Sequence, residues 1–284
     1  EPTEKQYTTN FEIGQPLDGS ALGVVLAGDG FAPGTVVRHR MGWRDHAVID
    51  AATATVVDTE AAPAGAWLGI LGQTGFTAWV GLRRIAEMHE GDVVFVSAAA
   101  GAVGTAAAQF AKLLGAAGVV GSAGGAAKVQ RLVDDLGYDG GFDYRSERAS
   151  AGLRRVAPDG IDVYFDNVGG EQLVAALGCM HLHGRVALCG MISQFDTSAR
   201  VYDINRIIGA VLRRVTIRGF IVRDHEDMRP EFEQRVSAWL RSGEVVNHQT
   251  VVDGIDHAVD AFLGMLQGDN IGKALVRLDT SWPV

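Results

Sequence analysis

The sequence predicts an α/β protein in which a parallel sheet, covered by helices on both faces, follows a smaller all-β unit. Three observations support this prediction. Short apolar runs broken by frequent turn signals fill residues 1–70, whereas strand-like and helix-like segments alternate from residue 71 onward. The apolar run Val93–Ser97 leads through small residues directly into a helical pattern, which is typical of a strand–turn–helix unit.

Residues 1–70 are expected to form short strands. Gly, Thr, Val and Asp are frequent there, and the pairs Asp18-Gly19, Asp29-Gly30 and Pro33-Gly34 are turn signals. The chain begins at Glu1 in what reads as the middle of such a unit, so we expect a further N-terminal segment before it.

From residue 71 the alternation favours a doubly wound parallel sheet. Strands are expected at 93–97, 119–123, 141–144, 161–167, 185–190 and 215–222, and helices at 77–88, 103–114, 128–136, 172–180, 204–212 and 231–242. The tail from Val251 is expected to add a helix near 258–266 and a closing strand at 274–278.

Composition excludes several classes of protein. The 284 residues, 47% of them hydrophobic and 21% charged, suit one large or two medium globular domains, and the net charge of −9 argues against a nucleic-acid partner. No apolar run reaches the roughly 18 residues of a membrane span, and no secretory signal is visible, so a cytoplasmic location is the default. Cys179 and Cys189, the only cysteines, read as small buried hydrophobes, and they form neither a disulfide framework nor a zinc cluster.

The turn after the first strand of the parallel sheet carries a chemical signal. Gly101, Ala102, Val103 and Gly104 lie between Val93–Ser97 and the helical stripe that follows. Small residues allow the backbone to approach a pyrophosphate, and the helix N-terminus supplies free N–H groups and a partial positive charge. Gly104 allows the helix to pack close to the strand. We therefore predict dinucleotide binding, against a merely structural turn.

The end of the second strand favours NADP(H) over NAD(H). An NAD site usually has an acidic residue there for the ribose 2′-hydroxyl, whereas this strand ends in Gly121-Ser122-Ala123-Gly124-Gly125. Lys128 and Arg131 follow in the next helix, and Tyr144-Arg145 ends the third strand. Hydroxyl donors and cations suit a 2′-phosphate. The alternative is that Lys128 and Arg131 are ordinary solvated helix residues.

Later strands end in further candidate ligands, because the carboxyl ends of parallel strands face one crevice. Asn167 follows the fourth strand and is a candidate for a ribose or nicotinamide contact, with a turn-forming role as the alternative. Cys189-Gly190-Met191-Ile192-Ser193 and Gly219-Phe220-Ile221-Val222 end the next two strands.

Five segments in this order resemble the zinc-independent medium-chain dehydrogenase/reductases, in particular the group of leukotriene B4 dehydrogenases, prostaglandin reductases and plant double-bond (alkenal) reductases. They are Gly75-Phe76-Thr77-Ala78-Trp79, Ser97-Ala98-Ala99-Ala100-Gly101-Ala102-Val103-Gly104, Phe165-Asp166-Asn167-Val168-Gly169-Gly170, Cys189-Gly190-Met191-Ile192-Ser193-Gln194 and Gly268-Asp269-Asn270-Ile271-Gly272-Lys273. The resemblance runs from about Phe11 to Leu278.

The resemblance implies a partial GroES-like β domain at 1–70, a Rossmann NADP-binding domain at 71–250, and a return to the first domain at 251–284. It implies phosphate contacts at Ser122, Lys128 and Tyr144, and pyrophosphate and ribose contacts at Gly101–Gly104 and Asn167. It also implies nicotinamide contacts near Gly190, Ile192, Ser193 and Phe220–Val222, with a further contact at Asn270. The implied activity is zinc-independent reduction of the C=C bond of a hydrophobic enone or enal by NADPH. Two edge strands joined across a twofold axis would form a homodimer.

One departure from the family concerns the substrate side. Relatives commonly read Ile-Ser-Gln-Tyr, whereas this chain has Phe195, and a phenyl ring cannot donate a proton. Tyr202, the cofactor ribose or water then remain as sources of the catalytic hydroxyl. Trp43, Trp79 and Phe195 are expected to line the substrate pocket, with the protein core as the alternative for both tryptophans. No metal ligands are expected. Quinone reduction, or cofactor binding without turnover, are the alternative functions.

Overall fold

A six-stranded parallel sheet forms the centre of the molecule. The structure is a computed structural model that describes residues 12–194 and 207–279. The strand order is β6–β5–β4–β7–β8–β9, so the direction in which the chain adds strands reverses between β4 and β7. This is the doubly wound Rossmann arrangement that the sequence predicts. The strands are β4 (Val93–Val96), β5 (Gly118–Ala123), β6 (Gly140–Asp143), β7 (Ile161–Asp166), β8 (Met180–Leu188) and β9 (Thr216–Gly219).

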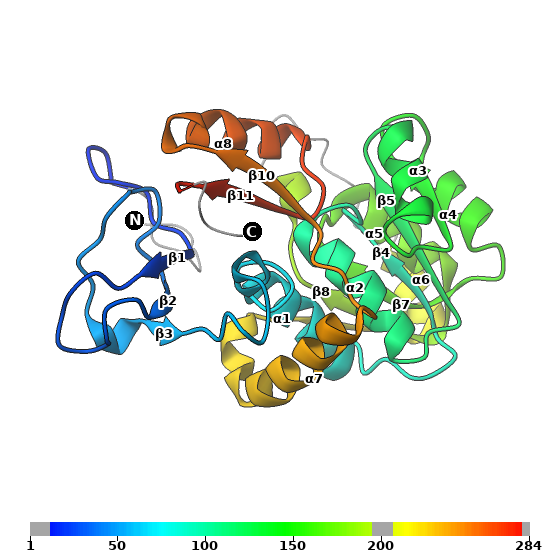
Figure 1. The fold of residues 1–284 in the computed structure, drawn as a ribbon. Coiled ribbons are helices and arrows are strands. Elements are labelled where there is room, and N and C mark those ends of the chain that lie inside the picture. The colour runs from blue at the N-terminus through cyan, green and yellow to red at the C-terminus, as the bar shows by residue number, and fades with distance from the viewer. Residues whose placement is uncertain (1–11, 195–206, 280–284) are drawn as a thin grey trace, which may run out of the picture.

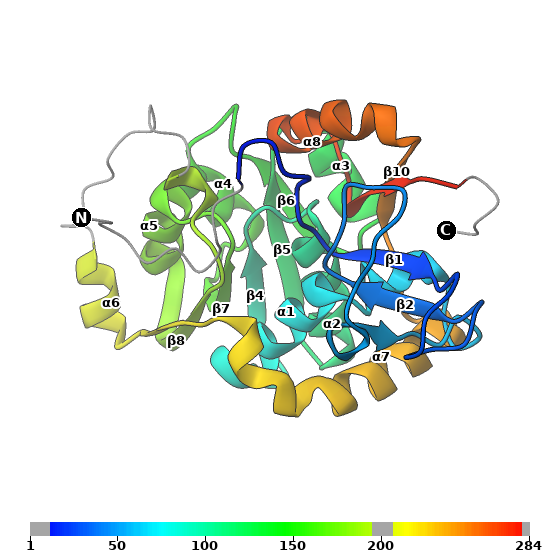
Figure 2. The same ribbon diagram turned by 90° about the vertical axis from the view of Figure 1, so that its left-hand side faces the viewer.

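Helices cover both faces of this sheet (Figure 2). Alternation along β4 shows why: Val94 and Val96 belong to one buried cluster, whereas Phe95 between them belongs to another. The first cluster takes in α1 (Gln73–Val80), α2 (Ala102–Leu113), α3 (Ala126–Asp134) and α7 (Arg229–Ser242). The second takes in α4 (Ala149–Val156), α5 (Gly170–Cys179) and α6 (Ile208–Arg213). Burial on both faces explains the nearly unbroken apolar runs of these strands.

A small antiparallel sheet precedes this domain. It contains β1 (Ala21–Val24), β2 (Val36–His39) and β3 (Thr55–Val56) in that order. These strands are short and partly exposed, in keeping with the frequent turn signals of this part of the sequence. Figure 1 shows them beside the parallel sheet, with the end of the chain above and between the two.

The end of the chain joins these two parts. β10 (Gln249–Asp253) and β11 (Lys273–Arg277) pair in parallel, and α8 (Ala258–Gln267) connects them. Gly272 forms a β-bridge with Gly101, at the start of α2. On the other side, the ring of Phe262 in α8 packs edge-on against Trp43, with 5.8 Å between ring centroids.

Some expected elements differ from the structure. Helix α4 and strand β10 were not expected, because α4 has a single large buried apolar residue, Leu153, and β10 is stabilised by pairing with a strand more than twenty residues away. β8 begins at Met180 rather than at the expected residue 185, so His181 and His183 lie inside a strand. His181 bonds through Nδ1 to the Asp162 carboxylate at 2.7 Å.

Candidate dinucleotide site

The turn between β4 and α2 has the geometry of a pyrophosphate cradle. Gly101 is the N-cap of α2 and no side chain caps the helix, so the first N–H groups remain available to a ligand. A Cβ atom on Gly104 would lie 2.6 Å from the carbonyl oxygens of Ala98 and Ala99. Only glycine therefore permits this close approach of helix and turn. Ala98 itself adopts a left-handed conformation, with φ of 50°.

Tyr138 fixes this turn from beneath, although no pattern in the sequence singles it out. Its buried hydroxyl donates to the carbonyl oxygen of Gly104 at 2.8 Å, and it lies 3.3 Å from that of Ala99. Burial raises the pKa of Tyr138 well above its ordinary value of 10.0, so the phenol stays a neutral donor. The turn is thus held rigidly before any ligand arrives.

Two cations lie beyond the ends of β5 and β6. Gly124 lies directly against the side chains of Tyr144 and Arg145, and a Cβ atom there would be 2.9 Å from the Tyr144 hydroxyl and 2.8 Å from Arg145 Nε. Lys128 lies in the first turn of α3, and its ammonium and the Arg145 guanidinium repel each other. A phenolic hydroxyl and a guanidinium therefore lie against a residue without a side chain, and both the guanidinium and the Lys128 ammonium lie near Gly268. This donor set fits a phosphate monoester.

Ser122 is a correction to the expected phosphate contacts. Its side chain is completely buried, and its hydroxyl donates to the amide oxygen of Gln172 in α5. The hydroxyl is therefore already engaged in the packed interior between β5 and α5. Lys128, Tyr144 and the neighbouring Arg145 remain as the candidate phosphate ligands.

Asp143 organises the same end of the sheet. Its Oδ1 atom accepts hydrogen bonds from the backbone N–H groups of Gly125 at 2.8 Å and Arg145 at 2.9 Å. The bond from Gly125 is the main reason why the pKa of this carboxyl lies below its ordinary value. Gly125 has a φ of 95°, a conformation that favours glycine. One carboxylate thus holds both loops that carry the candidate phosphate ligands.

Asn167 is held by a buried network at the end of β7. Its Nδ2 donates to the Ser97 carbonyl oxygen at 2.8 Å, and its backbone N–H donates to Ser97 Oγ at 2.9 Å. Asp166, which is fully buried, accepts from the Tyr164 hydroxyl at 2.7 Å and from the N–H groups that begin the next turn. Burial raises the pKa of Asp166 above its ordinary value. With Nδ2 engaged, the amide oxygen of Asn167 is the atom suited to accept a ribose hydroxyl or carboxamide N–H.

The loop after β8 is bound to the turn after β7. Ser193 Oγ donates to the Val168 carbonyl oxygen at 2.6 Å, and the N–H of Gly190 donates to the Asp166 carbonyl oxygen at 3.0 Å. Ile192 is 56% exposed beside them. After β9, Phe220 lies near Gly81 and Phe165, and Ile221 is partly exposed. The structure therefore brings the predicted contacts at Asn167, Gly190, Ile192 and Ser193 together, with Phe220–Val222 at the end of the neighbouring strand.

Trp79 is a second correction, because it is a core residue. Its side chain is completely buried and packs against Phe110, Phe232 and Trp239, with ring centroids 6.0–6.3 Å apart. It is therefore not part of a pocket wall. Trp43 lies at the junction with α8, and its role toward a substrate stays a prediction. Phe195 and Tyr202 lie outside the described residues.

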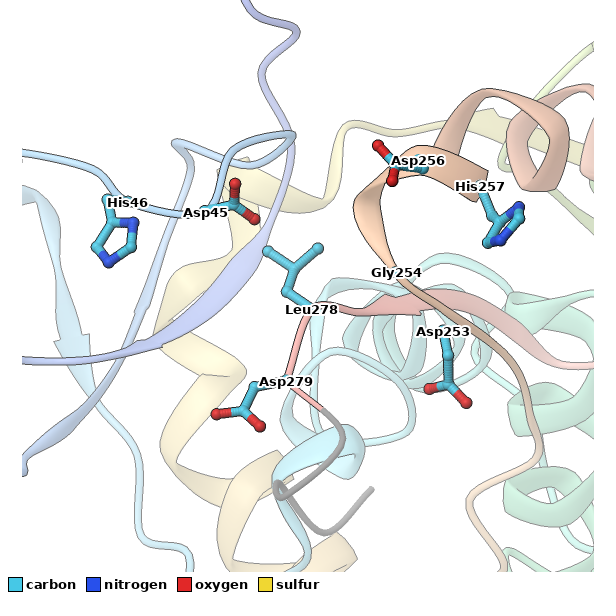
Figure 3. Close-up of a pocket in the computed structure, with 8 residues that line it drawn as sticks. All are labelled: Asp45, His46, Asp253, Gly254, Asp256, His257, Leu278 and Asp279. Carbon is cyan, nitrogen blue, oxygen red and sulfur yellow. The ribbon is translucent and has the colours of Figure 1, made fainter.

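A hollow at the other end of the β10–β11 sheet is separate from the dinucleotide site (Figure 3). Eight residues line it, and six of them are aspartates or histidines. They are Asp45, His46, Asp253, Gly254, Asp256, His257, Leu278 and Asp279. Asp253 is paired with Arg277. Gly272, which meets the nucleotide turn, lies at the opposite end of this sheet.

The described part of the chain shows neither a metal site nor a membrane span. Within 12–194 and 207–279, no group of three or more His, Cys, Asp or Glu side chains is arranged to hold a metal ion. In that same part of the chain, no helix is long and apolar enough to cross a bilayer. Both cysteines are only partly exposed, and burial raises the pKa of Cys189 to about 12, so its thiol stays protonated.

The parallel sheet, the uncapped helix N-terminus and the paired cations together define a dinucleotide-binding protein of the α/β class. Family models agree: one described as zinc-binding dehydrogenase matches residues 102–240, and one described as N-terminal domain of oxidoreductase matches residues 2–57. The 2-alkenal reductase (NADP(+)-dependent) of Nicotiana tabacum is 39% identical over 97% of this chain and 81% of its own length. Prostaglandin reductase 1 of Mus musculus is 38% identical over 87% of this chain and 76% of its own.

A solved structure supports the same family assignment as these family models and relatives. The crystal structure of CurA in complex with NADPH from Vibrio vulnificus superposes with a TM-score of 0.89, at 32% identity, over 97% of this chain and 84% of that one. The chain therefore belongs to the medium-chain dehydrogenase/reductase family, in the group that contains the alkenal and prostaglandin reductases.

Proposed function

We propose that this protein uses NADPH to reduce the C=C bond of α,β-unsaturated ketones and aldehydes, without zinc. The observation that carries the cofactor assignment is the pair of cations, Lys128 in α3 and Arg145 after β6. The end of β5, where an NAD site would have an acidic residue, has none. The substrate class is supported by the 2-alkenal and prostaglandin reductases to which the chain is similar.

The chain's own residues bind and orient the two reactants. The N–H groups at the start of α2 hold the pyrophosphate, while Lys128, Tyr144 and Arg145 hold the 2′-phosphate. Asn167 fixes the ribose or the nicotinamide carboxamide through its amide oxygen. A bound NADPH would supply a hydride for the β-carbon of the substrate, and the α-carbon would take a proton. The enolate formed between these steps needs hydrogen-bond donors near its oxygen, for which Tyr202 is the candidate side chain.

The test is NADPH consumption by the full-length protein with a panel of enones, enals and quinones, with NADH as the control. We expect NADPH-specific consumption with enones and enals, a saturated carbonyl product, and deuterium at its β-carbon when the cofactor carries deuterium at the transferred position. Activity that survives a strong chelator would support the zinc-independent mechanism.

Two other outcomes would replace the proposal. Consumption with quinones but not with enones would make the protein a quinone reductase. Tight NADPH binding with no turnover on any acceptor would make it a cofactor-binding protein, and Phe195 would then mark the loss of the chemistry.

We also propose a homodimer formed through the β9 edge of the sheet. β9 is the last strand of the sheet and is mostly exposed, and an uncovered edge with free backbone groups invites pairing. α6, which precedes it, presents Ile208, Val211 and Leu212 to solvent. Light scattering should give a dimer for the unaltered chain and a monomer for V211E. A monomeric unaltered protein would disprove this interface.

A further inference from the structure

The two candidate phosphate cations also hold the end of helix α8. Lys128 Nζ donates to the carbonyl oxygen of Gly268, and it donates to that of Asn270 at 2.7 Å. Arg145 Nη2 donates to the carbonyl oxygen of Gln267 at 3.0 Å. Free carbonyl groups give a helix C-terminus a partial negative charge, which favours cations at this position.

Residues 267–272, which we call the clasp, continue from these cations to the pyrophosphate turn. The N–H of Gly272 donates to the Ala100 carbonyl oxygen at 2.8 Å. A Cβ atom on Gly272 would lie 2.0 Å from the His248 carbonyl oxygen, so glycine is needed for this close approach. The clasp therefore contacts the predicted site in two places, at the 2′-phosphate cations and at the pyrophosphate turn. Through Phe262 and Trp43, α8 also reaches the first part of the chain.

The cations retain donors for a ligand. An ammonium has three N–H groups and a guanidinium five, and the bonds to the clasp use two of the first and one of the second. Partial burial lowers the pKa of Lys128, and the charge of Arg145 lowers it further, while Asp269 opposes the change. A doubly charged phosphate between the two cations would relieve their repulsion and leave the bonds to the clasp in place.

We propose that the 2′-phosphate, bound between Lys128 and Arg145, locks the clasp onto the nucleotide domain. NADP(H) would then close α8 over the site, whereas NAD(H) would fill the site and leave the clasp loose. This inference rests on the proposed use of NADP(H). NADP(H) and NAD(H) would then differ in the domain closure that they cause as well as in their affinity.

Amide hydrogen exchange with two fragments of the cofactor tests the clasp without any turnover. The probes are 2′,5′-ADP, which carries the 2′-phosphate, and 5′-AMP, which lacks it. The amides to follow are those of Gly268, Asp269, Ile271 and Gly272, which donate to Met265, Gly264, Thr250 and Ala100 respectively. At saturation, 2′,5′-ADP should slow their exchange about tenfold, the effect of one added charge-assisted hydrogen bond, and 5′-AMP should leave it within about twofold. Equal protection by both probes would overturn the inference.

Variants separate ligand binding from structure. R145Q should weaken 2′,5′-ADP binding about tenfold and leave 5′-AMP binding within about twofold. K128R keeps the charge and should retain most of the 2′,5′-ADP-dependent protection. The matched control is R131Q on the same helix, because Arg131 is paired with Asp135 rather than with the clasp; it should change neither binding nor protection.

The outcomes distinguish this inference from the proposed reaction. If only 2′,5′-ADP slows the exchange of the clasp amides in a protein that reduces no enone, the inference about the clasp is supported and the proposed enone reduction is disproved. Enone reduction by a protein in which R145Q binds both probes normally would remove Arg145 from the phosphate site.

Discussion

Gly104→Ala tests whether close packing of α2 on the nucleotide turn is required. The new Cβ atom would lie 2.6 Å from two carbonyl oxygens and 2.7 Å from the carbonyl carbon of Ala99, well inside the 3.0 Å that real Cβ atoms keep. The contacts are backbone atoms and cannot rotate away, so the helix must shift by at least 0.4 Å. Such overpacking costs about 1–3 kcal/mol. Alanine also favours a helix by up to about 1 kcal/mol. The steric cost is the larger effect, so we expect a net loss of about 1–2 kcal/mol in the free energy of unfolding.

The matched control is Gly178→Ala in α5, where a Cβ atom would meet no other atom within 4 Å. There the helix preference acts alone, and the variant should be as stable as the unaltered protein or more stable by up to about 1 kcal/mol. Urea unfolding measures both free energies. NADP+ titration should show about tenfold weaker binding for G104A alone, as one misplaced charge-assisted hydrogen bond would cause. A G104A protein with unchanged stability and affinity would refute the packing argument.

Three further predictions follow from other residues. Trp79→Phe should lower the free energy of unfolding by about 1–2 kcal/mol through a core cavity and leave KM for an enone unchanged; a changed KM would return Trp79 to the substrate pocket. Asp143→Ala removes the acceptor of two backbone N–H groups, so NADP+ should bind about three- to tenfold more weakly, and unchanged binding would contradict this role. The hydrogen bond to Asp162 raises the pKa of His181 above its ordinary 6.5. The contribution of this bond to the free energy of unfolding is therefore complete below about pH 6.5, and it declines as the pH rises through the raised pKa. The melting temperatures of H181Q and the unaltered protein should therefore differ more at about pH 5.5 than at about pH 8.5; the reverse order would refute the assignment.

The sequence predicts the parallel sheet and the nucleotide turn well, because both are encoded locally. Val93–Ser97 and the following small residues specify strand, turn and helix within a dozen positions. Trp79 shows where such reasoning fails. A tryptophan beside a predicted crevice reads the same whether it faces the crevice or the core, and the partners that bury it come from α2 and α7.

Ser122 and Lys128 also show that a local sequence pattern does not reveal long-range contacts. The structure removes Ser122 as a phosphate candidate and keeps Lys128. Both follow from the pattern at the end of β5, yet the hydroxyl of Ser122 turns to Gln172, which lies 50 positions away in the sequence. Lys128 stays a candidate phosphate ligand, but its bonds to the clasp connect residues 140 and 142 positions apart. Contacts of this range depend on the assembled fold, so no local pattern reveals them.

The bridge between Gly101 and Gly272 also bears on how the protein is made. A ribosome extends a chain by about 5–20 residues per second, and N-terminal parts tend to fold first. The partners of Lys128 in the clasp are synthesised 140 and 142 positions after it, a delay of about 10 s. Until then the nucleotide turn lacks its last strand and the two cations lack their carbonyl partners. A nascent chain would thus acquire a complete cofactor site only after residue 272 has been synthesised.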